Sequence, residues 1–212
     1  HRGLIEDELK YDRIREWKRP QNIYFFDCQQ IKIEGITLKD PASWNQTYDQ
    51  CDQLIVENIT VDSKAYWNND GIDIVDCTNV VIRNSYFDAA DDAICLKSHS
   101  AEKICENILI ENCTARSSAS GLKFGTVSRG GFRNVTVKNL TVFDTYRSAI
   151  TFASVDGGLI DNILVDGVRS LNTGNVIYLR IGDRWGGKDK KPSMKNITIR
   201  NQYAEVPATK PD

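Results

Sequence analysis

Residues 106–115 read ENILIENCTA, and this phrase recurs in varied form along most of the chain. The other copies are QQIKIEGITL (29–38), DQLIVENITV (52–61), TNVVIRNSYF (78–87), RNVTVKNLTV (133–142), DNILVDGVRS (161–170) and KNITIRNQYA (195–204). Their second residue is Asn or Gln, at positions 30, 53, 79, 107, 134, 162 and 196, so successive copies lie 23 to 34 residues apart. A loosely constant period of this size indicates stacked supersecondary units.

Each phrase alternates apolar and polar residues, which is typical of a β-strand, and turn-forming Asn and Gly surround it. No amphipathic helix of a dozen residues interrupts the array, which argues against βαβ units and leucine-rich repeats. A propeller blade needs four strands in roughly 40–45 residues. We therefore predict an all-β, right-handed parallel β-helix, a solenoid of about seven coils with three short strands per coil.

The predicted solenoid is a single domain over residues 19–212, and residues 1–18 form a loop or helix that leads into it. We expect the chain to be a piece of a longer protein. Of its 212 residues, 41% are hydrophobic and 26% charged, with a formal net charge of −2. This near-neutral balance argues against nucleic acid as a partner. No apolar run approaches the ~18 residues of a membrane helix, so we expect no membrane insertion.

The residues two places before each recurrent Asn or Gln are all apolar. They are Cys28, Cys51, Cys77, Cys105, Phe132, Ile160 and Met194. Such a column points into the core, and we predict that its cysteines are buried free thiols that pack as small hydrophobes. Metal ligation or disulfide pairing is the weaker alternative.

A second set of strands follows the phrases and can be stacked in the same way. Its members are DGIDIV (70–75), DAICLK (92–97), SGLKFG (120–125), SAITFA (148–153) and NVIYLR (175–180). Period-2 alternation turns one row outward at Asp73, Cys95, Lys123, Thr151 and Tyr178. The next outward row contains Val75, Lys97, Gly125, Ala153 and Arg180.

The strand entrances bring acidic residues together. Asp70 and Asp92 stand in one column on neighbouring rungs, ~4.8 Å apart, and Asp91 and Asp73 flank them. Like charges at this spacing raise one another's pKa, a cost that indicates a functional site on the solvent face. Paired carboxyls are what glycoside hydrolysis needs, one protonated and the others ionised. A calcium site or ordinary turn acids are the alternatives.

With these motifs in view, the chain resembles glycoside hydrolase family 28, the polygalacturonase-like parallel β-helix hydrolases. The family's Asn-Thr-Asp motif corresponds to NNDG (68–71) and its Gly-Asp-Asp motif to ADD (90–92). The resemblance extends from RPQNIYFFDC (19–28) through PASWNQTYDQC (41–51) to GGLIDNILVDGV (157–168). It implies that Asp91 is the general acid and that Asp70 and Asp92 hold and deprotonate water, with inversion at the anomeric carbon.

Two further family motifs are missing. Ser120 stands at the His position of Gly-His-Gly, and Thr151 and Ala153 replace both cations of Arg-Ile-Lys. In the family those cations hold the carboxylate of galacturonate. Lys123 lies one rung before Thr151 and is predicted to supply a substitute charge, although a solvated surface lysine is the alternative. The remaining residues predicted to bind substrate are Asn68, Asp73, Lys97, Ser120 and Arg180.

The segment SSASGLKFGT (117–126) resembles bacterial pectin-utilisation members of the family. We therefore expect a monomeric, secreted or periplasmic bacterial enzyme that hydrolyses a pectic or related plant glycan without a cofactor or metal. The alternatives are a polysaccharide lyase on the same fold, with Lys or Arg as the base, and a non-catalytic glycan-binding β-helix.

Overall fold

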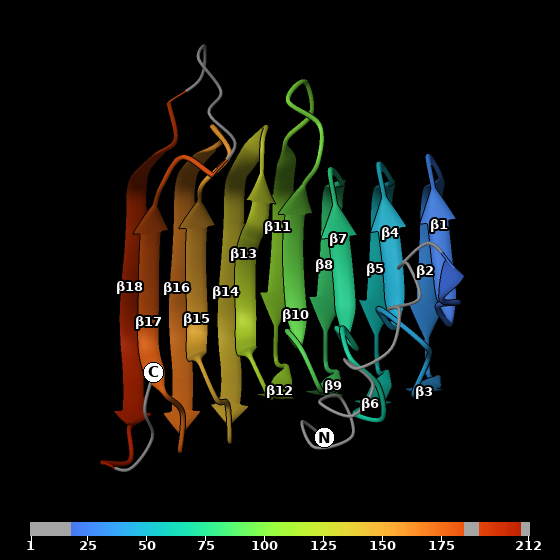
Figure 1. Ribbon diagram of the computed structural model, residues 1–212, viewed down its shortest axis with the longest axis horizontal. Coiled ribbons are helices and arrows are strands. Elements are labelled where there is room, and N and C mark those ends of the chain that lie inside the picture. Colours follow the sequence, from blue (N-terminus) through green and yellow to red (C-terminus); the bar gives the residue numbers. More distant parts are fainter. Residues whose placement is uncertain (1–17, 185–190, 209–212) are drawn as a thin grey trace, which may run out of the picture.

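The computed structural model describes residues 18–184 and 191–208, and they form a parallel β-solenoid (Figure 1). Every strand pair that the structure describes is parallel, so each turn of the chain stacks on the preceding one in register. Within the repeated phrase, Leu54 pairs with Val80, Val80 with Ile108 and Ile108 with Val135. The predicted architecture is confirmed. Of the predicted leading segment, residues 1–17 lie outside the described part of the chain.

A seven-stranded sheet forms the face that carries the acidic residues. Its strands, in spatial order, are β1 (Ile23–Phe26), β4 (Gln46–Asp49), β7 (Ile72–Val75), β10 (Ile94–Ser98), β13 (Ser120–Ser128), β15 (Ser148–Ser154) and β17 (Asn175–Ile181). Seven passages through this sheet correspond to about six complete turns of the solenoid, close to the predicted seven.

The repeated phrases form the opposite face. Their strands are β2 (Gln29–Glu34), β5 (Asp52–Glu57), β8 (Thr78–Arg83), β11 (Cys105–Glu111), β14 (Gly131–Phe143), β16 (Leu159–Leu171) and β18 (Ser193–Glu205). Shorter strands complete the early turns, namely β3 (Thr37–Lys39), β6 (Thr60–Ser63), β9 (Tyr86–Ala89) and β12 (Thr114–Ser117). The long strand β14 pairs with both β11 and β12, which joins these two sets into one sheet.

Apolar columns fill the interior, as the repeat predicted. Cys105 pairs with Phe132, Phe132 with Ile160 and Ile160 with Met194, and the cysteines of this column are free thiols. On the facing sheet, Phe124 stacks on Phe152 with ring centroids 4.7 Å apart. This continuous core holds the seven-stranded sheet rigid beneath the acidic residues.

The recurrent Asn and Gln residues all adopt a left-handed backbone conformation, with φ between 53° and 58°. Their side chains form a ladder: Asn107 donates to Asn79 at 3.2 Å, Asn134 to Asn107 at 3.2 Å and Asn162 to Asn134 at 2.8 Å. Asn tolerates positive φ better than most residues, which explains its choice at this position.

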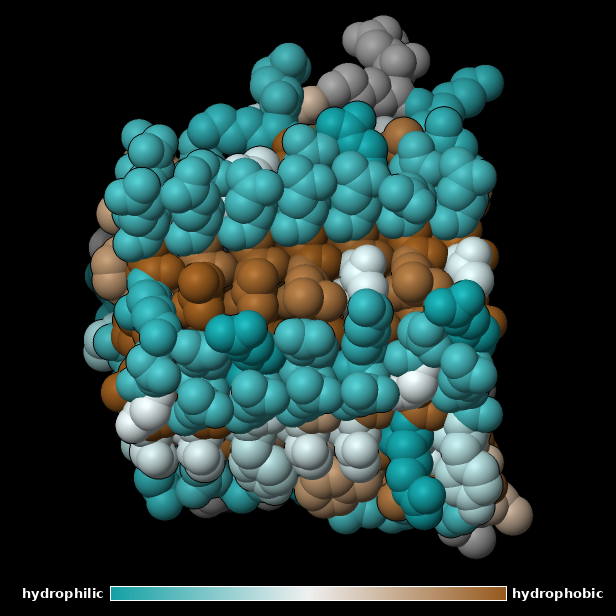
Figure 2. All heavy atoms as spheres, turned by 180° about the vertical axis from the view of Figure 1, so that it is seen from behind, coloured by the Kyte–Doolittle hydropathy of each residue, from teal (hydrophilic) through white to brown (hydrophobic). Residues whose placement is uncertain are grey.

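The outer face of the phrase sheet carries an apolar stripe that crosses the strands (Figure 2). Ile55, Val81 and Leu109 lie side by side in it, and Thr136 and Leu164 continue the same row. Polar rows border the stripe on both sides. Within the described residues, no helix has the length and apolar character needed to span a membrane.

Candidate active site

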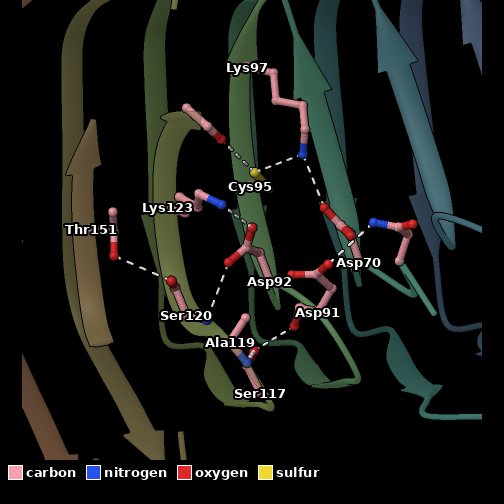
Figure 3. Close-up of polar contacts among 12 residues, drawn as sticks. Asp70, Asp91, Asp92, Cys95, Lys97, Ser117, Ala119, Ser120, Lys123 and Thr151 are labelled. Atoms are coloured by element: carbon pink, nitrogen blue, oxygen red, sulfur yellow. Dashed lines mark hydrogen bonds and ion pairs between the residues drawn. The ribbon is translucent and has the colours of Figure 1, made fainter. Parts of the chain in front are cut away.

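Asp70 and the pair Asp91–Asp92 lie at the entrances of neighbouring strands, β7 and β10 (Figure 3). Gly71 N donates to Asp92 O at 2.9 Å, so Asp70 and Asp92 stand one rung apart as predicted. The two rungs approach so closely that a Cβ on Gly71 would lie 2.4 Å from the carbonyl oxygen of Ala93. Glycine is therefore required directly after Asp70.

Lys97 connects two of the acids. Its Nζ lies 3.0 Å from Asp70 Oδ2, is hydrogen-bonded to Asp73 Oδ1 and lies 3.0 Å from Cys95 Sγ. The same ammonium stands 4.5 Å from the centroid of the Trp44 ring. Lys97 and Asp73 are both buried, and a buried ammonium needs opposite charge around it. Asp73 therefore supplies a counter-charge that keeps Lys97 against Asp70.

Lys123 is the partner of Asp92. Its Nζ lies 2.6 Å from Asp92 Oδ2, and the other oxygen of Asp92 accepts a hydrogen bond from Ser120 N at 3.2 Å. Both oxygens of this carboxyl thus receive donors, which favours its ionised form.

Asp91 has different neighbours. Asn68 donates to Asp91 Oδ2 at 3.4 Å, and Asn68 Oδ1 accepts from Arg19 at 3.2 Å. Because a guanidinium only donates, Arg19 orients the Asn68 amide so that its NH₂ group faces Asp91. The backbone of Asp91 is held as well, since Ser117 Oγ donates to its carbonyl oxygen.

The surroundings separate the pKa values of Asp91 and Asp92. Burial, together with the charges of Asp70 and Asp92, raises the pKa of Asp91 to about 7. Burial also opposes ionisation of Asp92, but Lys123 and Lys97 outweigh it and lower the pKa of that carboxyl. The pKa of Asp70 is raised by burial, against the pull of Lys97. Below about pH 7, a protonated Asp91 therefore stands beside an ionised Asp92.

The acids do not lie on an open solvent face, and this corrects the expectation from the sequence. Asp70, Asp73 and Asp92 are 3%, 0% and 2% exposed. The segments before β4 and β7 fold together beside them, because Asn69 Nδ2 donates to the carbonyl oxygens of Pro41 at 2.7 Å and of Ser43 at 2.5 Å. Alternation shows which side of a strand a residue takes and says nothing about the loops above it.

The two predicted outward rows are only partly regular. Asp73, Cys95, Lys123, Thr151 and Tyr178 pair in sequence across the sheet, as predicted. In the next row the register shifts, because Leu96 pairs with Phe124 but Ser98 pairs with Ser128. The ladder therefore contains no pair between Lys97 and Gly125, whereas Ala153 and Arg180 do pair.

A cavity of about 470 Å³ opens beside the acids, over β13, β15 and β17. Ser120, Lys123 and Arg180, three of the residues predicted to bind substrate, line it. The other three, Asn68, Asp73 and Lys97, lie among the acids instead. Arg147 also lines the cavity, and the sequence analysis did not predict it. It directly precedes the entrance of its strand, as Asp91 does two rungs earlier, and this shared position could have identified it.

The spacing of the acids suits a bridging water molecule better than a metal ion. Single oxygens of Asp70 and Asp92 and the sulfur of Cys95 lie within 4.8 Å of one another. Two acceptors at this separation can be bridged by one water molecule. A metal ion fits the same trio poorly, because the Lys97 ammonium already bonds to Asp70 and Cys95. Together with protonated Asp91, the arrangement can donate one proton and accept another.

Comparison with known proteins found similar sequences and structures. Residues 10–173 match the family described as "Glycosyl hydrolases family 28". A probable polygalacturonase of Vitis vinifera is 23% identical over 186 residues, which cover 87% of this chain and 34% of the relative. The chain thus spans about a third of that curated relative's length.

Two solved structures share the fold. The hyperthermoactive exopolygalacturonase of Thermotoga maritima has a TM-score of 0.75 and 26% identity, and the match covers 88% of this chain and 44% of that one. A family 28 exopolygalacturonase of Yersinia enterocolitica has a TM-score of 0.71 at 16% identity, over 84% of this chain and 33% of that one.

Proposed function

The chain belongs to the glycosyl hydrolases of family 28, and from this premise we propose that it hydrolyses a glycosidic bond of a pectic glycan with inversion at the anomeric carbon. Asp91 is the general acid, and Asp70 and Asp92 hold the attacking water. The observation that carries the proposal is the contrast between two adjacent carboxyls: Asp92 is paired with Lys123 at 2.6 Å, whereas Asp91 faces only the Asn68 amide, so the pKa of Asp92 is lowered and that of Asp91 is raised to about 7. Such a separation is what an acid and a base in one site require.

In the proposed reaction, protonated Asp91 gives its proton to the glycosidic oxygen as the bond to the anomeric carbon breaks. Water attacks the same carbon from the opposite face, and its proton passes to a carboxylate. Asp92 is the stronger candidate to receive this proton, because Lys123 keeps it ionised. Asp70, one rung away, orients the water by accepting its second hydrogen.

A lyase with a lysine base is disfavoured by the state of the lysines. A lysine that abstracts a proton must be a neutral amine. Burial favours that form, but the carboxylates around Lys97 and Lys123 outweigh it and raise the pKa of both lysines. Their ion pairs hold both side chains on the acids, so neither is a suitable base.

The substrate class is proposed from the family and its relatives, which include polygalacturonases. We expect a pectic polysaccharide or oligosaccharide, and a secreted or periplasmic protein of bacterial type, because such polymers are met outside the cytoplasm. The cavity over β13, β15 and β17 is the proposed site for one sugar next to the bond that breaks.

The test is product analysis on a panel of pectic oligosaccharides, with the wild type compared with Asp91→Asn. New reducing ends without ultraviolet absorbance, lost in Asp91→Asn, are expected. Ultraviolet-absorbing products would show a lyase, and binding without any turnover would show a glycan-binding protein. Arg133→Met, on the opposite sheet, is the control for expression and folding, since its partner Glu106 is remote from the acids.

A further inference from the structure

The apolar stripe on the phrase sheet lies on the face opposite the acids, and Figure 2 shows it open to the surroundings. In order along the solenoid axis it contains Ile55, Val81, Leu109, Thr136, Leu164 and Thr198. These residues alternate with core residues along their strands, so their side chains point outward. The aliphatic ones are only partly buried. A row of this length on an outer sheet face is a candidate surface for association.

A row of charged side chains borders the stripe on one side, two residues further along each strand. In the same order it contains Glu34, Glu57, Arg83, Glu111, Lys138, Asp166 and Arg200. From Glu57 to Arg200 the sign of the charge changes at every rung. The neutral asparagine ladder borders the stripe on the other side. The two borders therefore differ in charge, which restricts how this face can meet a partner.

Ion pairs within the chain account for part of the alternation. Arg83 binds Glu57 at 2.7 Å, and Arg200 binds Asp166 at 2.8 Å. The two residues in the middle of the row differ. Glu111 and Lys138 are neighbours in register, yet within residues 18–184 and 191–208 neither takes part in an ion pair. Two opposite charges at the centre of the face are thus left for a partner.

One two-fold axis makes the face complementary to itself. The axis runs parallel to the strands and passes between β11 and β14. It places Glu111 opposite Lys138 of the second copy, and each such contact forms twice. The same axis brings together Arg83 with Asp166, Glu57 with Arg200, and Val81 with Leu164.

Other two-fold arrangements do not match. An axis through β11 would set Glu111 against itself and Arg83 against Lys138, and like charges in contact oppose association. An axis along the solenoid would lay the charged row on the neutral asparagine ladder and leave its charges without partners. The charge pattern therefore selects a single arrangement, in which the same patch is used by both copies.

The size of the face indicates a weak association. Six overlapping strands at ~4.8 Å and six residues per strand at ~3.3 Å give roughly 29 Å by 20 Å, or roughly 600 Å² for each copy. A stable complex typically buries about 800 Å² per partner. The expected dimer is therefore reversible at micromolar concentration.

We propose that two copies of this chain associate through the outer face of the phrase sheet, around a two-fold axis between β11 and β14. Such a dimer replaces the monomer expected from the sequence. The acids lie on the seven-stranded sheet at the opposite face, so both candidate active sites point outward and stay open. The inference goes beyond the proposed function and does not depend on hydrolysis.

The test is charge reversal at the two central residues, followed by analytical ultracentrifugation. The wild type is expected to dimerise with a dissociation constant of roughly 1–100 µM. Glu111→Lys and Lys138→Glu each place like charges opposite one another twice, and each should weaken dimerisation at least about 100-fold. An equimolar mixture of the two variants restores opposite charge at both central contacts, so it should form a heterodimer with about the affinity of the wild type.

Lys39→Glu is the matched control. Lys39 lies in β3, beyond the turn at Gly35 and on the rung that the two-fold axis leaves unmatched, so this variant should dimerise like the wild type. Urea midpoints establish that each variant is folded. A wild type that stays monomeric up to about 1 mM would overturn the proposal. Single variants that dimerise as tightly as the wild type, or a mixture that stays monomeric, would overturn it as well.

Discussion

Lys123 Nζ lies 2.6 Å from Asp92 Oδ2, so the carboxyl that follows the proposed acid carries its own counter-charge. Asp91, one residue earlier, has no ion pair of this kind among the described residues, and an amide donor faces it instead. Asp91 and Asp92 therefore differ in protonation because one faces a neutral amide from the rung before and the other a lysine from the rung after.

Replacement of Lys123 by Met should shift the pH profile of kcat/KM to higher pH. Lys123 stabilises ionised Asp92 and lowers its pKa, so its loss raises that pKa and shifts the acidic limb of kcat/KM to higher pH. The alkaline limb should also move to higher pH, because Lys123 lowers the pKa of Asp91 and its removal raises that pKa. Lys123→Arg keeps the charge and serves as the control. An unchanged acidic limb in Lys123→Met would argue against Asp92 as the base.

The pH dependence of kcat/KM in the wild type should show the ionisation of Asp91. An acid with a pKa of about 7 is protonated below that pH and ionised above it, so kcat/KM should fall as the pH rises through about 7. Asp91→Asn should lower kcat about 10²- to 10⁴-fold. The loss should be much smaller on an aryl glycoside whose leaving group needs no proton, and a full loss there would contradict the assignment.

Lys97→Met should destabilise the fold, because it leaves Asp70 and Asp73 buried without their shared cation. Removal of one partner from a buried ion pair costs about 3–5 kcal/mol. The folded-state pKa values of both acids are already raised, and they rise further without Lys97. The folded state then binds more protons than the unfolded state, so the variant loses stability as the pH rises above the unfolded pKa of ~4.

The measurement for Lys97→Met is urea unfolding at pH 5 and pH 7, with the larger loss expected at pH 7. The double variant Lys97→Met/Asp73→Asn removes one of the two buried charges and should recover part of the stability. Equal losses at both pH values would contradict this account.

The asparagine ladder offers a test of the solenoid itself. Asn134 has a φ of 55° and links Asn107 to Asn162. Asn134→Ala removes both hydrogen bonds and leaves in the left-handed region a residue with a Cβ but without the polar side chain that lets Asn adopt it, at a cost of about 1–2 kcal/mol. Asn134→Gly loses the same bonds without the backbone strain. The urea midpoint should therefore be highest for the wild type, lower for Asn134→Gly and lowest for Asn134→Ala. Equal midpoints for the two variants would show that backbone strain does not contribute.

The sequence by itself determined the solenoid and the rows of its sheets. A repeat of alternating residues must stack in register to bury its apolar columns, and this is why the cysteine column, the Asn positions and the neighbouring rungs of Asp70 and Asp92 follow from the pattern. Only the tertiary structure decided which charges meet. Lys97 reaches across to β7 while Lys123 stays with Asp92, the register shifts after Leu96, and Arg19 and Arg147 join the site. These contacts depend on long side chains and on loops from distant rungs, and a period-2 pattern within one strand carries no information about either.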